Sequence, residues 1–122
     1  TVRANASIAE FWPILTDNLH KRFDAKPVHT LDEMLLLQSR FPDNIIQYSA
    51  YREGHIIGGI TFYISQQVVH GQYSGTNDEG KEYGAMEAIY EQVMYQDYKD
   101  WPYLDFGYGG RGVVYDTYEW EL

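Results

Sequence analysis

The fold is decided by residues 44–75, NIIQYSAYREGHIIGGITFYISQQVVHGQYSG. Three runs rich in Ile, Val, Tyr and Phe lie within this stretch, at 44–51, 55–64 and 67–75. Turn-forming residues bound each run, which is typical of β-strands. The connections 52–54 and 65–67 are short enough to make both pairs of strands antiparallel hairpins. The adjacent Gly58 and Gly59 interrupt the middle run, so we expect a β-bulge there, or the close approach of a neighbouring element or a ligand.

Two helical patterns precede the strands. Within residues 7–23, apolar residues recur at spacings of three and four, which predicts an amphipathic helix with a capping box at its start. Pro13 would remove a hydrogen bond from the interior of this helix, so the helix either bends or begins near Trp12. A second capping box at Thr30 opens a shorter helix that continues as far as Phe41.

A helix and a further strand are predicted after residue 75. The helix spans about 81–98, and the strand spans 103–107. Because a strand, a crossover helix and a second strand form one unit, the new strand should lie parallel to its neighbour. The segment 113–122 fits either a last strand or a helix. Together the elements predict an α/β (α+β) fold, with a mixed, mostly antiparallel central sheet flanked by helices.

The size and composition of the chain indicate one folded domain. Its 122 residues fit the usual ~100 to 200 residues of a single domain, which we place at 1–122. The hydrophobic content of 44% and the aromatic content of 16% exceed those of disordered chains. The sequence begins with Thr1 and not with Met, so we expect a processed start or a fragment of a longer chain.

The charge and the missing cysteines narrow the classes of function. The chain has 18 acidic and 9 basic residues and a net charge of −9, which argues against DNA, RNA and anionic membranes as partners. No apolar run approaches the ~18 residues of a membrane span, so we expect no membrane insertion and a cytoplasmic location. The absence of Cys excludes disulfides, thiolate metal sites and a Cys nucleophile.

Four histidines are candidates for chemistry. No pair has the HxH or HExxH spacing of metal ligands, so no metal is expected. We expect His20 to be solvated, His55 to be exposed and structural, and His29 to order a loop. His70 is of more interest because it interrupts an otherwise apolar strand. It is either a hydrogen-bonded histidine of the sheet or a catalytic base.

The polar loop 76–80 leads into the helix predicted at about 81–98, with Lys81 and Gly84 at the helix entrance. Unpaired N–H groups and the helix dipole favour an anion such as phosphate at such a position, and Gly80 would let a ligand approach. The acidic residues of the loop suit helix capping instead, and the pattern is neither GxGxxG nor a P-loop. Both interpretations stay open.

Six segments occur in a recognisable order: Glu10–Phe11–Trp12 with Ile14–Leu15 and Leu19, Pro27–Glu33, Arg40–Pro42, Ile56–Gly59, His70–Tyr73 and Leu104–Gly107. In their order and spacing, over 11–107, they resemble bacterial acyltransferases of the GNAT superfamily. The resemblance is to the branch related to Fem-type peptidoglycan-bridge transferases and to acetyltransferases found near cell-surface polysaccharide genes. Relatives continue after the segment matching 104–107 through another helix and closing strands, so we expect the C-terminus here to be shortened.

The resemblance implies a GNAT-like fold, in which an antiparallel meander leads to a helix and to a strand that diverges from its neighbour to admit a pantetheine arm. It implies transfer of an acyl group from acyl-CoA, such as acetyl-CoA, to a small-molecule amine. That amine would be an amino sugar or a related cell-envelope precursor. Because the amine attacks directly, no protein nucleophile is needed, which is compatible with the lack of Cys.

Carried over by position, the resemblance also assigns site residues. The contacts to CoA fall on Gln72, Ser74, Gly75, Asn77, Gly80, Lys81 and Gly84. Either His70 or Tyr73 would deprotonate the amine. A tyrosine near the C-terminus, Tyr115 or Tyr118, would protonate the departing thiolate. The alternative is a non-catalytic module on the same scaffold that binds a glycan or a protein through exposed tyrosines, and a homo-oligomer is left open.

Overall fold

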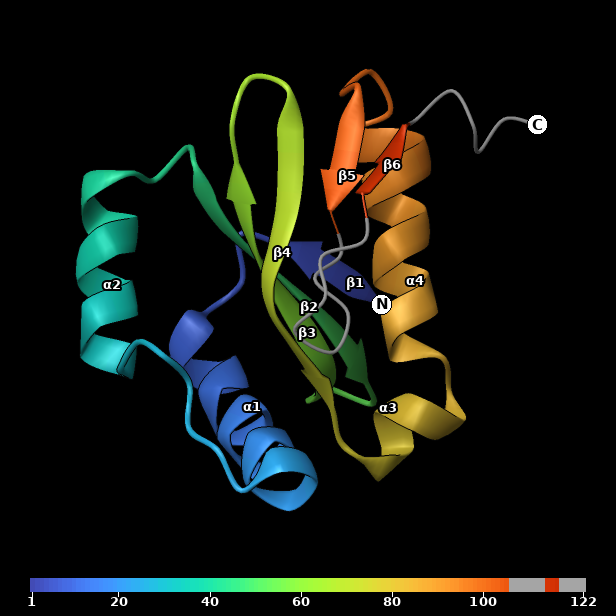
Figure 1. The fold of residues 1–122 in the computed structure, drawn as a ribbon. Helices are drawn as coiled ribbons and strands as arrows, with labels where there is room; N and C mark the ends of the chain where they lie inside the picture. The colour runs from blue at the N-terminus through green and yellow to red at the C-terminus, as the bar shows by residue number, and fades with distance from the viewer. Residues whose placement is uncertain (106–113, 117–122) are drawn as a thin grey trace.

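The computed structural model describes residues 1–105 and 114–116 of the chain. In chain order its elements are β1 (Val2–Ala4), α1 (Ile8–Phe23), α2 (Leu31–Arg40), β2 (Ile45–Arg52), β3 (His55–Ile64), β4 (Val68–Thr76), α3 (Asp78–Glu82), α4 (Ala85–Gln92), the π-helix η1 (Val93–Asp97), β5 (Tyr103–Asp105) and β6 (Val114–Asp116). Figure 1 shows them as a central sheet between helices. No helix among the described residues is long and apolar enough to cross a membrane.

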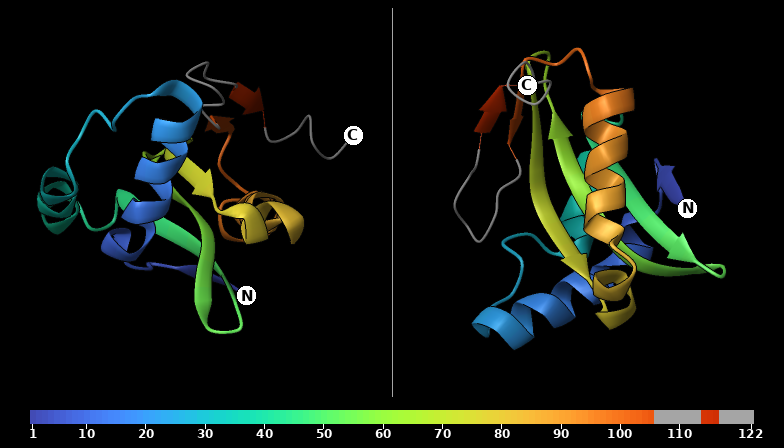
Figure 2. Two further views of the ribbon diagram at one scale, coloured as in Figure 1. Left: turned by 90° about the horizontal axis from the view of Figure 1, so that it is seen from below. Right: turned by 90° about the vertical axis from the view of Figure 1, so that its right-hand side faces the viewer.

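The described strands form one six-stranded sheet in the order β1-β2-β3-β4-β5-β6. All neighbouring strands are antiparallel except β4 and β5, which are parallel. Helices α1 and α2 cover one face, and α4 covers the other (Figures 1 and 2). The expected α/β fold, with a mixed, mostly antiparallel sheet flanked by helices, is therefore confirmed.

Each face of the sheet has its own apolar core. On the α4 face, Ile89 and Val93 pack against strand residues such as Phe62, and all three are fully buried. On the face of α1 and α2, Phe11 and Met34 are likewise fully buried. These two layers hold β4 between them and so fix the strand that carries half of the ten predicted site residues.

Helix α1 begins at Ile8, directly after its N-cap residue Ser7, and not at Trp12. The Ser7 hydroxyl accepts a hydrogen bond from the Glu10 N–H at 3.2 Å, and Pro13 lies inside the 16-residue helix. The side chain of Glu10 accepts from the Tyr51 hydroxyl, so only the Ser7 half of the expected capping box is used across this turn. In α2 the full capping box predicted at Thr30 is present.

The prediction of a single helix at about 81–98 is wrong, because this part of the chain forms α3, α4 and η1. Gly84 has φ +68°, a left-handed conformation that glycine adopts without strain, and it separates α3 from α4. The last turn is the π-helix η1. Strand β1 was not expected either, because three residues carry no readable periodicity.

The predicted strands are confirmed to within a residue or two at each end. Both features expected at Gly58 and Gly59, a β-bulge and the close approach of a neighbouring element, are present. A β-bulge at Ile57 precedes them, and a Cβ on Gly59 would lie 2.7 Å from the Gln47 side chain and 2.8 Å from the ring of Phe11. These glycines are therefore explained by packing against neighbouring elements.

The strand predicted to follow the crossover helix is β5, and it lies parallel to β4 as expected. Of the two alternatives for the tail, the strand is found at Val114–Asp116, which pairs antiparallel with β5. The predicted site residue Tyr118 and the rest of the tail lie outside the described residues.

Candidate functional site

The candidate site lies along the open edge of β4. Strand β5 pairs with β4 only from Val68 to His70, and the last pair is His70 with Asp105. Strand β4 continues to Thr76 with no partner strand on this side in the described part of the chain. Residues of α1 and α4 line a cavity beside this part of β4.

Asn18 of α1 closes the far end of this edge. Its amide nitrogen donates to the Thr76 carbonyl at 2.8 Å, and its amide oxygen accepts from the Thr76 N–H at 3.1 Å. The side chain therefore pairs with β4 as a neighbouring strand would. Both backbone groups of Thr76 point away from β3, which fixes the direction of the other groups along the strand.

Ser74 offers the unpaired backbone of this edge. Backbone groups alternate in direction along a strand, so the N–H and C=O of Ser74 point the same way as those of Thr76. No side chain like that of Asn18 engages them among the described residues. An extended ligand with amide groups can therefore pair with β4 at Ser74.

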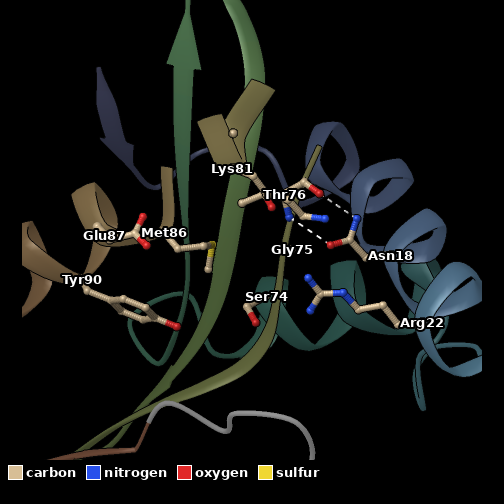
Figure 3. A pocket seen from close by; sticks show the side chains of 10 residues that line it. Asn18, Arg22, Ser74, Gly75, Thr76, Lys81, Met86, Glu87 and Tyr90 are labelled. Atoms are coloured by element: carbon tan, nitrogen blue, oxygen red, sulfur yellow. Dashed lines mark hydrogen bonds between the residues drawn. The ribbon is translucent and has the colours of Figure 1, made fainter. Parts of the chain in front are cut away.

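A polar cavity of ≈ 420 Å³ adjoins Ser74 (Figure 3). Asn18 and Arg22 reach it from α1, and Lys81 reaches it from α3. Glu87 and Tyr90 of α4 line the opposite wall. A smaller cavity of ≈ 140 Å³ adjoins the same two cations, so Arg22 and Lys81 border both hollows. Two cations beside an open strand edge are suited to an anionic ligand, although the chain as a whole is acidic.

Four of the seven residues predicted to contact CoA line this polar cavity: Ser74, Gly75, Gly80 and Lys81. Asn77 lines the smaller hollow, and its side chain caps α3 by accepting from the Gly80 N–H at 2.8 Å. Gly84 lines neither hollow and serves as the N-cap of α4. The five-residue α3 has Asp78 and Glu79 in its first turn, so the observed structure favours the capping interpretation of this loop.

Gly80 is required for packing. A Cβ built on it would lie 2.0 Å from the carbonyl oxygen of Ile57, far inside van der Waals contact. The β-bulge at Ile57 brings that carbonyl toward α3, where it also accepts from the Asn77 N–H at 3.2 Å. This tight approach positions α3, and with it Lys81, at the polar cavity.

The histidine predicted as a catalytic base lies where β4 and β5 stop pairing. The Nδ1 atom of His70 is 2.7 Å from a carboxylate oxygen of Asp105, and its Nε2 is 2.9 Å from Oε1 of Gln72. A carboxylate only accepts hydrogen bonds, so Nδ1 carries a proton. Nε2 faces the amide oxygen of Gln72, so it can accept a proton only when that amide presents its NH₂ group instead or gives way to another donor.

A second β-bulge brings the two candidate bases to one face. Along β4, Gly71 pairs with Phe62 and Tyr73 pairs with Thr61, so Gln72 is the extra residue. Without it, His70 and Tyr73 would project from opposite faces of the sheet. The bulge therefore aims both side chains at the face of α1 and α2.

Tyr73 is joined to His29 of the α1–α2 connection. Its hydroxyl lies 2.8 Å from Nδ1 of His29 and accepts a hydrogen bond from the His29 N–H at 3.1 Å. The ring of Trp12 packs edge-on against the ring of Tyr73, with 5.5 Å between centroids. His29 orders its loop as expected, and Tyr73 is held in a hydrogen-bonded, buried position.

The other two histidines lie at the surface, as expected. His20 is exposed and lies 3.3 Å from Asp24 at the end of α1. His55 lies 3.0 Å from Glu79, which also contacts Arg52 at 3.2 Å. No group of three or more metal-ligating side chains occurs among the described residues.

Two further cavities continue the site along β4. One of ≈ 300 Å³ is lined by Gln72, Tyr73 and Ser74, and it shares Asn18, Arg22 and Ser74 with the polar cavity. The other, of ≈ 510 Å³, has His70 and His29 in its wall. The edge of β4 thus runs from two cations at one end, past the bulge, to a carboxylate-bound imidazole at the other.

Sequence reasoning missed Asn18, Arg22, Glu87 and Tyr90, which line the polar cavity. Asn18 and Arg22 are four residues apart in α1 and so share a helix face, which was a weak signal. The sequence singled out Asp105 only as part of the segment Leu104–Gly107. Its contact with His70 depends on the pairing of β4 and β5.

Comparisons with known proteins leave the family open. No family model matches the chain, and no curated protein matches it. Function is therefore inferred from the geometry of β4 and the cavities beside it.

Proposed function

We propose that the chain is an N-acyltransferase that transfers an acyl group from acyl-CoA to an amine. One observation carries the proposal: among the described residues the edge of β4 has no partner at Ser74, and it lies directly beside a cavity lined by two cations. A ligand that is an amide chain at one end and a polyphosphate at the other matches both features. CoA is such a ligand.

In the proposal, CoA is recognised at the Thr76 end of β4, beside the polar cavity. The amide groups of the pantetheine arm would pair with the backbone N–H and C=O of Ser74, as an added strand does. Arg22 and Lys81 would hold the phosphates, with Arg22 able to offer a bidentate contact. Glu87 lies on the far wall, so its charge is separated from the cations.

In the proposal, acyl transfer takes place at the His70 end of β4, next to the bulge at Gln72. The amine nitrogen attacks the thioester carbon of acyl-CoA, a C–N bond forms, and the C–S bond breaks. His70 accepts the proton lost by the amine at Nε2, where the amine replaces Gln72 as the partner. Asp105 holds the ring in the correct tautomer through Nδ1. The departing thiolate takes up a proton from solvent, and His70 releases the amine proton to solvent, so charge and atoms balance.

Calorimetry with acetyl-CoA tests the proposal. We expect binding with a stoichiometry of one and a higher Tm at saturating ligand. Arg22→Gln should weaken binding about tenfold, since it removes one charge-assisted contact to a phosphate. Arg40→Gln is the matched control, because Arg40 is exposed on α2 and lines none of the cavities of the site.

Absence of heat and of any Tm shift with acetyl-CoA and with longer acyl-CoAs would overturn the proposal. Equal weakening by Arg22→Gln and Arg40→Gln would show only general electrostatics and would remove the polar cavity from the account. Binding of acetyl-CoA without turnover of any amine would favour the non-catalytic module.

A further inference from the structure

The cavity at the His70 end is lined very differently from the polar one. It lies between the end of α2 and strands β3 and β4, and its volume of ≈ 510 Å³ is that of a small-molecule site. Most of its wall is apolar, formed by Leu37, Phe41, Ile45, Ile64 and Val68. Phe41 is half exposed at the mouth, so the cavity opens to solvent.

The polar side chains in this wall already have hydrogen-bond partners. Tyr63 donates to the sulfur of Met34 at 3.4 Å, and burial raises the pKa of its phenol, so the phenol stays protonated. Asn44 donates to the Ile64 carbonyl at 2.9 Å, and Ser65 bonds to the backbone of Val68. A ligand rich in hydroxyl groups would lose its bonds to water here without equal replacement.

His29 and His70 are the two imidazoles in this wall, and His70 is the one that also contacts a carboxylate. Nε2 of His70 contacts a side-chain atom, Oε1 of Gln72, and not the backbone. Behind the His70 ring lies the carboxylate of Asp105. A ligand with one basic nitrogen and an apolar body would place its nitrogen at Nε2 and its body against Leu37 and Phe41.

We propose that this cavity binds the body of the acceptor, and that the acceptor is a primary amine carried on an aryl or alkyl group. The inference rests on the proposed function and narrows it, because it disfavours a bare amino sugar. The net charge of −9 attracts such a cation toward the chain. The bulge at Gln72 lies between this cavity and the edge at Ser74, so the amine and a thioester held there would meet beside His70.

Two primary amines with different bodies test the inference. The probes are 2-phenylethylamine and glucosamine, each titrated into the protein alone and into the protein saturated with acetyl-CoA. We expect 2-phenylethylamine to bind at least about tenfold more tightly, since it can bury its ring. Phe41→Ala should weaken its binding about tenfold, and Leu36→Ala should not. Leu36 is also exposed on α2, but it does not line the cavity.

Tighter binding of glucosamine, equal binding of the two amines, or insensitivity to Phe41→Ala would each overturn the assignment of the cavity. Phe41 and Leu36 are both half exposed, so neither variant should prevent folding. A protein that binds 2-phenylethylamine in this manner but not acetyl-CoA would overturn the proposed function alone. A protein that binds acetyl-CoA but neither amine would overturn the inference alone.

Discussion

The two ends of β4 belong to one strand but have opposite surroundings. At the Thr76 end, the open edge meets a polar hollow with Arg22 and Lys81. At the His70 end, it meets β5 and an apolar hollow that contains one carboxylate-bound imidazole. Under the proposed function, this difference would let one strand serve two substrates, since an anion and an apolar amine need opposite walls.

The two ends are also built differently. The polar end depends on tight backbone packing and on a side chain that imitates a strand, at Gly80 and Asn18. The His70 end depends on side-chain contacts around a bulge at Gln72. Substitutions at the first should therefore change stability, and substitutions at the second should change turnover.

The largest effect is expected at Gly80. In Gly80→Ala the new Cβ would clash with the Ile57 carbonyl, so α3 must move, and we expect unfolding to become about 3 kcal/mol easier in urea. Gly75→Ala is the milder comparison, because its Cβ would meet only side-chain atoms at 3.1 Å or more, those of Asn18 and Ile14. Equal loss of stability in the two variants would show that the close approach at Gly80 is not what positions α3.

The next effect is expected at His70. If it accepts the proton of the amine, His70→Ala should lower kcat by at least ~10²-fold when measured well below its Tm, in addition to the stability lost with its bonds to Asp105 and Gln72. His20→Ala is the control, since His20 is exposed and contacts only Asp24 at the end of α1. Near-normal turnover in His70→Ala would move the base to Tyr73 or to solvent.

A smaller effect is expected at Asn18. Asn18→Ala leaves the N–H and C=O of Thr76 without their side-chain partner, which should cost about 2 kcal/mol of stability. The neighbouring Asp17→Ala removes only an exposed contact to Lys21 and should change stability by less than about 0.5 kcal/mol. If both variants unfold at the same urea concentration, the pairing of Asn18 with β4 adds nothing measurable.

The sequence predicted what depends on near neighbours. The strand runs of the meander have alternating or continuous apolar patterns, and the cap at Thr30 depends on a residue three positions away. Helix α3 was merged with α4 because a glycine inside an apolar period does not by itself show a left-handed φ, as Gly84 has here. Of the seven residues carried over for CoA, four line the polar cavity. Three of the seven have packing or capping roles in the structure, namely Asn77, Gly80 and Gly84.

Long-range contacts could not be predicted. The Asn18 pairing joins residues 58 positions apart, the His29 pairing with Tyr73 spans 44, and that of His70 with Asp105 spans 35. Each depends on strand register, and the bulge at Gln72 changes which residues share a face. A polar residue within β4 was a recognisable signal at His70, but nothing nearby in the chain indicated its partner.

The smallest effect is expected for the pH dependence of the contacts that Glu79 makes with Arg52 and His55, which lie away from both ends of β4. The His55 hydrogen bond and the Arg52 contact lower the pKa of Glu79, which holds the β2–β3 hairpin to α3. A carboxyl with a folded pKa below its unfolded value stabilises the fold above that unfolded value, and the contribution is lost as pH falls through the folded pKa. Wild type should therefore exceed Glu79→Gln in stability at pH 7, and the gap should close below about pH 4.

Glu91→Gln is the control, because it removes an exposed carboxylate that has no ion pair among the described contacts. In urea titrations across that pH range, its stability difference from wild type should not close in this way. A constant difference between wild type and Glu79→Gln at all pH values would show that the ionised carboxylate is not what holds the hairpin.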